Sequence, residues 1–263
     1  QDKAFLETIE ACERDHDIAQ QIYLIRDNFK PIKGKKFSAN KNATNPLSEE
    51  QVSAIQNSLE VGVSIITGGP GTGKTRIIEG LAQVLVNGFG KTIRICAPTG
   101  RAAKRIAENQ ALKKFHPSTI HMLKAQIDAA AKDTDFDALI VDESSMIDIN
   151  LFNDLVKMLP LGSQLIFIGD VDQLPPVGAG QPFLDLIRSK KIVVSRLTKQ
   201  FRQGSDSVIP NVAKAINKGE LIEFSTDFAN SGFSFVEVEK GQIVEKIIEV
   251  VDFFTGNKNG IVD

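Results

Sequence analysis

The nine residues TGGPGTGKT, from Thr67 to Thr75, restrict the fold of this chain more than any other stretch. They follow VSIIT (63–67), an apolar run typical of a buried strand, and they precede residues with the spacing of an amphipathic helix. Glycines allow consecutive backbone N–H groups to turn toward one anion, and the following helix adds the positive end of its dipole. The pattern Gly-x4-Gly-Lys-Thr between a strand and a helix therefore predicts a loop that encloses nucleotide phosphates.

The last residues of this loop have separate predicted tasks. Lys74 is expected to reach the β- and γ-phosphates of ATP, and the Thr75 hydroxyl is expected to hold Mg²⁺. A glycine-rich turn that binds nothing is the alternative, and the strand–loop–helix context argues against it. The other loop residues predicted to contact the nucleotide are Gly68, Gly69, Pro70, Gly71, Thr72, Gly73 and Arg76.

A second segment, ALIVDESSMID (138–148), has an apolar run that ends in two carboxylates, Asp142 and Glu143. The run predicts a buried strand, and ligands of α/β sheets bind at the carboxyl ends of their strands. Asp142 is expected to complete the Mg²⁺ site through a water, because Mg²⁺ keeps much of its hydration shell. Glu143 is expected to orient or deprotonate the attacking water. Alone, a strand ending in Asp-Glu is more often structural, and kinases also carry acidic residues here.

A third segment, LIFIGDVDQLPPVGAG (165–180), has a strand pattern followed by a loop with two prolines. Prolines fix φ and stiffen the loop that carries Gln173. An amide on a rigid loop beside a nucleotide suits a sensor that distinguishes ATP from ADP. An ordinary proline turn explains the pattern equally well.

Apolar runs alternate with helical spacing from residue 47 onward, which predicts a mostly parallel α/β sheet covered by helices on both faces. We expect an N-terminal helical segment and linker over 1–45, the nucleotide-binding domain over 46–196, and a further domain beginning at 197–263. The expected strands lie near 63–67, 93–97, 138–142, 164–169 and 192–197. Beyond these, helices are expected over 3–29, 207–218 and 241–254, and a strand over 233–238. The apolar residues at the end of the sequence look like the opening of another strand, which suggests a fragment.

Composition excludes several classes of protein. Apolar residues make up 42% of the chain and charged residues 24%, as in soluble globular proteins. No apolar run is long enough to span a membrane and no signal peptide is present, so we expect a cytoplasmic protein. Cys12 and Cys96 lie far apart, without metal or redox spacing, and are expected to be core residues. The net charge of −2 requires any nucleic-acid surface to be local.

The order of these motifs resembles that of the superfamily 1B DNA helicases, most closely the RecD-like group, which includes the alpha chain of exodeoxyribonuclease V. The resemblance covers about 47–203 and is weaker beyond. LSEEQVSAI (47–55) is similar to the adenine-reading segment of the family, which implies that Gln51 contacts the base. LTKQFRQ (197–203) is similar to the segment whose arginine, Arg202 here, reaches the γ-phosphate from the second motor domain. An arginine suits that role because its charge is permanent and delocalised.

Two further segments, APTGRAA (97–103) and STIHML (118–123), are similar to segments that grip single-stranded DNA in the family. At the first one, free N–H groups and a hydroxyl at a strand-to-helix junction could contact a phosphate, with basic residues of the helix, Arg105 among them, adding charge. A helix cap with a solvated basic face is the alternative. His121 could contact a base or phosphate, or cap its helix. The residues implied to contact DNA are Pro98, Thr99, Gly100, Arg101, Thr119 and His121.

The resemblance implies a RecA-like phosphate-loop domain followed by part of a second one, and an ATP- and Mg²⁺-dependent helicase that moves 5′ to 3′ on single-stranded DNA in repair or recombination. Subunits of a nuclease complex are implied partners. In the implied cycle, the catalytic residues are Lys74, Glu143, Gln173 and Arg202. A nucleotide-regulated subunit without motor activity and a clamp-loader-type or kinase-type phosphate-loop protein are the alternatives. The later motifs of the family are absent from this sequence, as is a complete array of helix-hairpin-helix motifs, so we expect no unwinding by these residues alone.

Overall fold

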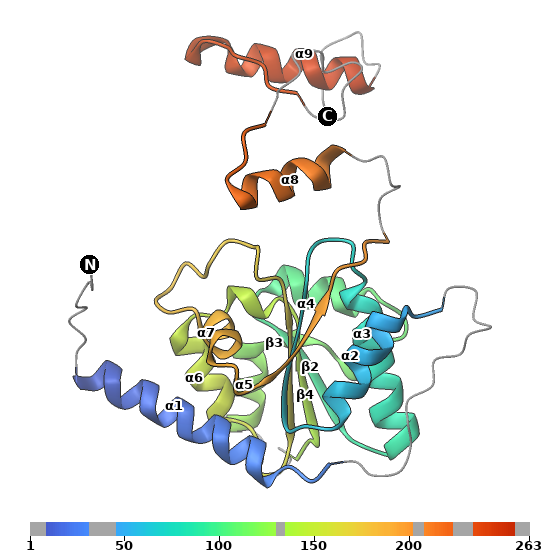
Figure 1. Cartoon of the computed structure of the whole chain (residues 1–263), viewed down its shortest axis with the longest axis vertical. Coiled ribbons are helices and arrows are strands. Elements are labelled where there is room, and N and C mark those ends of the chain that lie inside the picture. Colours follow the sequence, from blue (N-terminus) through green and yellow to red (C-terminus); the bar gives the residue numbers. More distant parts are fainter. Residues whose placement is uncertain (1–8, 32–45, 130–134, 202–207, 223–233, 256–263) are drawn as a thin grey trace. The chain divides into compact units, whose positions relative to one another are not determined.

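The computed structural model of the chain describes residues 9–31, 46–129, 135–201, 208–222 and 234–255. The residues divide into two compact units, one up to Arg202 and one from Gln203 onward. The first unit contains a parallel sheet between two layers of helices (Figure 1). The second unit contributes two of the described helices.

Six parallel strands form the sheet in the order β3-β2-β4-β5-β1-β6. The central strands are short and fully buried, as expected for a sheet covered on both faces. The strands are β1 (Val63–Gly68), β2 (Ile93–Ala97), β3 (Ser118–Thr119), β4 (Ala138–Val141), β5 (Gln164–Gly169) and β6 (Val193–Leu197). The five expected strands are thus confirmed to within a residue at each end, and β3 is an additional strand that the sequence pattern did not reveal.

Side chains of the strands alternate between two hydrophobic cores, because successive residues of a strand point to opposite faces. In β5, Ile166 and Ile168 pack in one core, and Leu165 and Phe167 pack in the other. The first core is closed by α2, α3 and α4, and the second by α1, α5, α6 and α7 (Figure 1). The helices are α1 (Ile9–Asn28), α2 (Glu49–Leu59), α3 (Lys74–Gln83), α4 (Gly100–Ala107), α5 (Ile120–Ala129), α6 (Ile149–Lys157), α7 (Pro182–Ser189), α8 (Val208–Lys218) and α9 (Ile243–Thr255).

Helix α1 covers the sheet face of the second core. Its buried residues Ile18, Ile22 and Ile25 follow the spacing of one helical face and join the cluster around Phe152. The cysteine on β2, Cys96, is fully buried in the same cluster, as expected, and burial raises the pKa of its thiol. The side chain of Cys12 lies outside the described residues.

The strand expected over 233–238 is not confirmed. Ser234 makes a single bridge, and the described residues after it, 235–239, have no regular secondary structure before α9 begins. A strand needs a neighbour to satisfy its backbone N–H and C=O groups, and the described part of this unit contains no second strand. The helices expected beside it are confirmed as α8 and α9.

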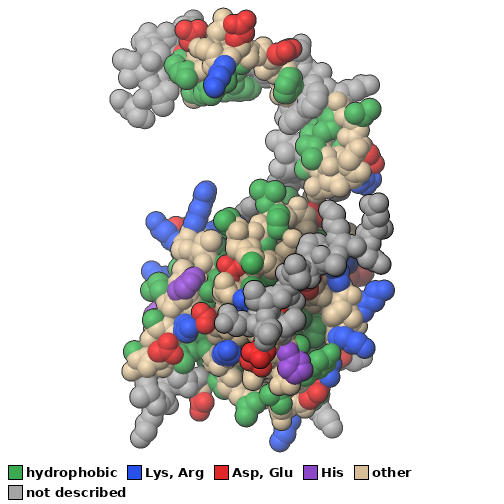
Figure 2. Space-filling view, turned by 90° about the vertical axis from the view of Figure 1, so that its left-hand side faces the viewer, with side chains coloured by type: hydrophobic (Ala, Val, Ile, Leu, Met, Phe, Trp, Pro, Cys, Tyr) green, Lys and Arg blue, Asp and Glu red, His purple; other side chains and the backbone are tan. Residues whose placement is uncertain are grey.

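Charge is spread over the surface of the first unit. On the face shown in Figure 2, lysine and arginine side chains are interspersed with acidic ones and do not merge into one basic patch. This agrees with the net charge of −2, so any surface that binds nucleic acid depends on local groups. None of the helices in the described ranges is long and apolar enough to cross a membrane.

Candidate nucleotide and DNA site

Strand order brings the chemical groups of the three motifs together. The loop after β1, the acidic pair after β4 and the loop after β5 leave the sheet at its carboxyl edge, where β5 lies between β4 and β1. The edge is tied together locally, because the backbone N–H of Val171 donates to Oγ1 of Thr67 at 3.2 Å. Ligands of open α/β sheets bind at this edge.

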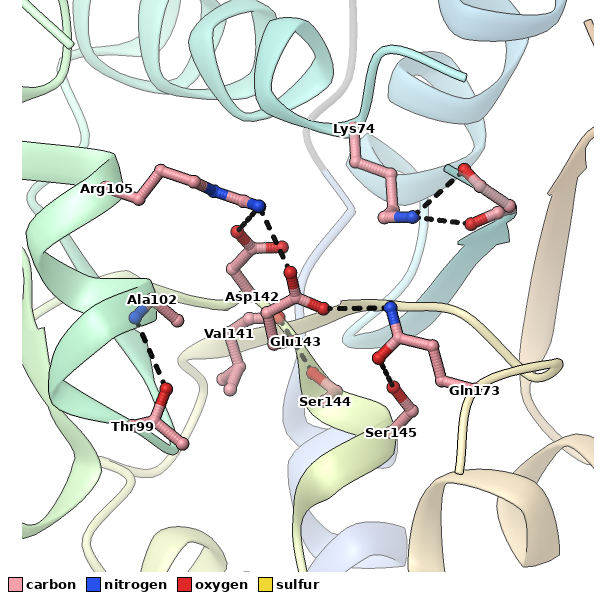
Figure 3. A network of polar contacts seen from close by, with 12 residues as sticks. Lys74, Thr99, Ala102, Arg105, Val141, Asp142, Glu143, Ser144, Ser145 and Gln173 are labelled. Atoms are coloured by element: carbon pink, nitrogen blue, oxygen red, sulfur yellow. Dashed lines mark hydrogen bonds and ion pairs between the residues drawn. The ribbon is translucent and has the colours of Figure 1, made fainter. Parts of the chain in front are cut away.

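The first residues of the glycine loop hold the ammonium group of Lys74. The Nζ of Lys74 donates to the carbonyl oxygens of Gly68 at 2.6 Å and Gly69 at 3.2 Å (Figure 3). Gly73 has a φ of +84°, a conformation that favours glycine, and it precedes the first residue of α3. The loop thus places a cation and the positive end of a helix at one point, which is a site for an anion.

The acidic pair lies opposite this cation. Asp142 is 1% exposed, and neither of its carboxylate oxygens has a hydrogen-bond partner. Burial, reinforced by the charge of neighbouring Glu143, raises the pKa of Asp142, whereas the nearby backbone N–H of Glu143 and the charges of Arg105 and Lys74 oppose that shift. A buried carboxylate without a hydrogen bond is costly, and the ion pair with Arg105 at 3.6 Å offsets only part of that cost.

This environment fits Mg²⁺. The unpartnered oxygens of Asp142 are hard oxygen donors, and the hydroxyl of Thr75 lies one residue after Lys74 in the first turn of α3. The cation would offset the buried negative charge of Asp142, which no hydrogen bond now offsets. The residues present therefore suit the metal that the sequence predicts.

Glu143 is held by neighbours on both oxygens (Figure 3). Its Oε1 accepts from a guanidinium nitrogen of Arg105 at 3.1 Å, and its Oε2 accepts from Nε2 of Gln173 at 3.4 Å. The other end of the Gln173 amide accepts from Oγ of Ser145 at 3.4 Å. The backbone of Glu143 lies in the left-handed region, with φ 51°, which is uncommon for a residue other than glycine and is often found at functional sites.

The two segments expected to contact DNA are neighbours in space. Strands β2 and β3 pair in parallel, with Ala97 opposite Thr119, so the residues after each strand emerge side by side. Thr99 accepts from the backbone N–H of Ala102 at 3.3 Å and begins α4, and Thr119 accepts from that of Met122 at 3.1 Å at the start of α5. Both threonines thus cap helices. The same edge holds Pro98, Gly100, Arg101 and the exposed His121.

The side chain of Gln51, which is expected to contact the base, hydrogen-bonds to backbone groups in this structure. It is 1% exposed; its Nε2 donates to the carbonyl of Thr72 at 3.0 Å, and its Oε1 accepts from the backbone N–H of Ser48 at 3.0 Å. The second bond is half of a capping box that begins α2. Gln51 here supports the phosphate loop, and its contact with a base stays a prediction. Among the other predicted site residues, Arg76 lies half-buried on α3, and Arg202 lies outside the described residues.

Sequence reasoning missed the segment after β6. The carboxylate of Glu50 accepts from Oγ1 of Thr198 at 2.6 Å and from the backbone N–H groups of Thr198 and Lys199 at 2.9 and 3.1 Å. This tether leads the chain to Phe201, whose N–H donates to the carbonyl of Gly71 at 2.8 Å. The half-exposed ring of Phe201 therefore borders the phosphate loop. A sequence pattern offers no signal for such a contact, since its partners are about 150 residues apart.

Replacing Glu50 with alanine is expected to destabilise the fold by about 1 kcal/mol and to weaken nucleotide binding several-fold, because the segment beside the loop loses its tether. The hydrogen bond from the Thr198 hydroxyl is the largest of the causes that lower the pKa of Glu50. This stabilisation is thus fully present above the ordinary value of 4.5 and is lost as the pH falls through the lowered value. Thermal unfolding at pH 7 and at pH 3 measures the loss of stability and its dependence on pH, and the same measurement with added ATP reports the weaker nucleotide binding. Glu49→Ala, an exposed neighbour in the same turn, is the control; an equal loss in that variant would contradict the tether.

Comparison with known proteins assigns this chain to a family. Residues 46–233 match the profile of a protein family described as an AAA domain. The chain belongs to this family. With its phosphate loop, an AAA domain implies nucleotide binding.

Similar proteins include two named helicases and a subunit of the RecBCD enzyme. The ATP-dependent RecD2 DNA helicase of Deinococcus radiodurans is 35% identical over 185 residues, which are 68% of this chain and 25% of that protein. The RecBCD enzyme subunit RecD of Mycobacterium tuberculosis is 32% identical over 199 residues, 65% of this chain and 35% of the subunit. Among solved structures, the Pif1 helicase from Candida albicans has a TM-score of 0.52 and 27% identity, and the match covers 67% of this chain and 45% of that one.

These matches confirm two predictions about the AAA domain: its resemblance to RecD-like superfamily 1 helicases and its RecA-like α/β fold. The chain spans a quarter to about a third of the length of these two curated relatives. The activity, substrates and partners of the whole protein are therefore proposals, as are the roles of single residues.

Proposed function

We propose that this chain is the ATP-hydrolysing part of a DNA helicase, which couples hydrolysis to 5′ to 3′ movement on single-stranded DNA. The observation that carries the proposal is the common edge of the sheet, where Lys74, Asp142, Glu143 and Gln173 meet beside the helix that Thr99 caps. The name of the Deinococcus radiodurans relative, a DNA helicase, supports DNA as the polymer, and a protein that acts on DNA fits a cytoplasmic location.

Binding of ATP begins at the phosphate loop. The phosphate oxygens take the place of the carbonyl groups of Gly68 and Gly69 as partners of the Lys74 ammonium group. The N-terminus of α3 adds N–H donors for the same charges, and the segment that ends at Phe201 borders the loop. Thr75 and Asp142 would hold Mg²⁺, which when bound supplies positive charge to the phosphates during transfer.

Hydrolysis needs a base for the attacking water. Glu143 is the carboxylate next to Asp142 that can orient this water and accept its proton. Gln173 contacts Glu143 from the loop after β5 and thus suits a residue that reports the γ-phosphate. Arg202, expected to stabilise charge on the transferring phosphoryl, would follow directly after Phe201 in the chain.

The grip on DNA would lie at the ends of β2 and β3. Free N–H groups at the starts of α4 and α5 face the same edge of the sheet, and such groups bind phosphates of nucleic acids without reading sequence. Strand β2 pairs with both β3 and β4, so the DNA segment after β2 lies directly beside the acidic pair after β4, and β2 separates only the segment after β3 from that pair. A change in one site can therefore reach the other through a single rigid element.

ATP hydrolysis by the complete protein, measured with and without single-stranded DNA at low salt, tests the proposal. We expect single-stranded DNA to stimulate ATP hydrolysis strongly, because a helicase couples hydrolysis to movement only when it is bound to DNA. A similar rate with and without DNA would favour a clamp-loader-type ATPase, and binding without turnover would favour a nucleotide-regulated subunit. Residues 1–263 alone are expected to unwind no duplex, and unwinding by them in a strand-displacement assay would contradict that expectation.

A further inference from the structure

Arg105 is a cation that contacts both carboxylates of the acidic pair, Asp142 and Glu143. One nitrogen of its guanidinium lies 3.1 Å from Oε1 of Glu143 and 3.6 Å from Oδ2 of Asp142 (Figure 3). The first distance is a hydrogen bond and the second is an ion pair beyond hydrogen-bond reach. Sequence reasoning counted Arg105 among the basic residues at the DNA segment, whereas the structure turns it toward the nucleotide site.

The helix that carries Arg105 is the helix expected to grip DNA. Helix α4 begins directly after Thr99, which caps it, and Arg105 lies in its last turn. On the other side, Ala102, Ala103 and Ile106 of α4 are buried in the first core. A well-packed helix of two turns moves as one piece, so a shift at its start is transmitted to Arg105.

The contact leaves Glu143 poorly prepared to act as a base. Each of its oxygens already accepts a hydrogen bond, one from Arg105 and one from Gln173. A carboxylate that accepts the proton of a water must direct a lone pair at that water, and a charged donor on the same oxygen opposes this. The side chain of Arg105 is 53% exposed, so the pair is weak enough to be exchanged when other partners arrive.

We propose that Arg105 is a positioning residue that holds Glu143 in a resting orientation and releases it when single-stranded DNA engages α4. The inference rests on the proposed function and adds to it a physical link between DNA binding and ATP hydrolysis. Phosphates of DNA at the start of α4 compete for the charge of Arg105 or shift its helix. Glu143 then turns to the water at the γ-phosphate, and hydrolysis without DNA stays slow.

Steady-state ATP hydrolysis by the complete protein tests this link, with kcat and KM measured separately without DNA and at saturating single-stranded DNA. Arg105→Ala is expected to raise kcat without DNA about three- to fivefold, as expected for loss of a half-exposed ion pair. Its KM for ATP and its kcat at saturating DNA should stay within about twofold of the unmodified protein. Arg105→Lys keeps the charge but not the forked donor, so its kcat without DNA should lie between those of the unmodified protein and Arg105→Ala. Arg188→Ala, an exposed arginine of α7, is the matched control and should change neither rate.

Outcomes of this experiment separate the inference from the proposed function. If DNA stimulates the unmodified protein but Arg105→Ala hydrolyses ATP without DNA at the same or a lower rate, the inference is overturned and the proposed function stands. If DNA does not stimulate the unmodified protein, the proposed function fails and the inference fails with it. Should the alanine variant not fold, the lysine variant decides, because an unchanged rate without DNA in that folded variant would also overturn the inference.

Discussion

Glu143→Gln is expected to lower kcat for ATP hydrolysis by about 10²–10⁴-fold, the usual contribution of a general base. Glutamine has the size of glutamate but cannot accept the proton of the attacking water. Nucleotide binding should change little, because the phosphates are held by the loop around Lys74 and not by Glu143. Single-turnover hydrolysis and the binding of a fluorescent ATP analogue measure the two effects separately.

The matched control for this variant is Glu108→Gln, which changes an exposed glutamate at the end of α4 in the same way. It should retain full activity. A Glu143→Gln variant that hydrolyses ATP within about threefold of the unmodified protein would show that another group directs the water. Equal loss of binding and hydrolysis would show instead that Glu143 serves the shape of the site.

Asp142→Asn is expected to have two opposite effects. The folded protein without nucleotide should gain about 1 kcal/mol or more in stability, because a buried carboxylate without a hydrogen bond is replaced by a neutral amide. Mg²⁺-dependent hydrolysis should fall by about 10²–10³-fold, because the metal loses its negatively charged ligand. Thermal unfolding in the presence of a chelator measures the first effect, and hydrolysis over a range of Mg²⁺ concentrations measures the second.

Asp154→Asn is the control for both effects. Asp154 pairs with Lys124 on the surface at 2.7 Å, and such exposed pairs contribute little to stability. A lower melting temperature for Asp142→Asn would mean that Asp142 is stabilised in the folded protein by partners other than a metal. Retention of Mg²⁺-dependent hydrolysis would remove Asp142 from the metal site.

Glu143→Gln and Asp142→Asn both change a site that lowers the stability of the folded protein. The oxygens of Asp142 accept no hydrogen bond and Glu143 has an uncommon backbone conformation, so the site costs stability that the two hydrophobic cores offset. Such a trade is typical of sites that must receive charged ligands. It also explains why a variant that abolishes activity can make the protein more stable.

The sequence by itself determined the local elements of this chain. The strand, loop and helix around Lys74 were predictable because the apolar run, the glycines and the helical spacing follow one another directly between residues 63 and 83. Central strands were predictable since their apolar runs are continuous, and the acidic pair marked the end of one of them. The expected strand over 233–238 shows the limit of this reasoning, because a strand also depends on a partner elsewhere in the chain.

Only the tertiary structure decided which of these elements meet. Strand order places β5 between β4 and β1, which brings the acidic pair and Gln173 to the phosphate loop. The contacts of Arg105 with the acidic pair, of Glu50 with the segment after β6, and of Gln51 with the loop join residues 21 to 149 positions apart. Such contacts depend on how helices pack on the sheet, and that packing is a property of the whole core, which no local pattern encodes.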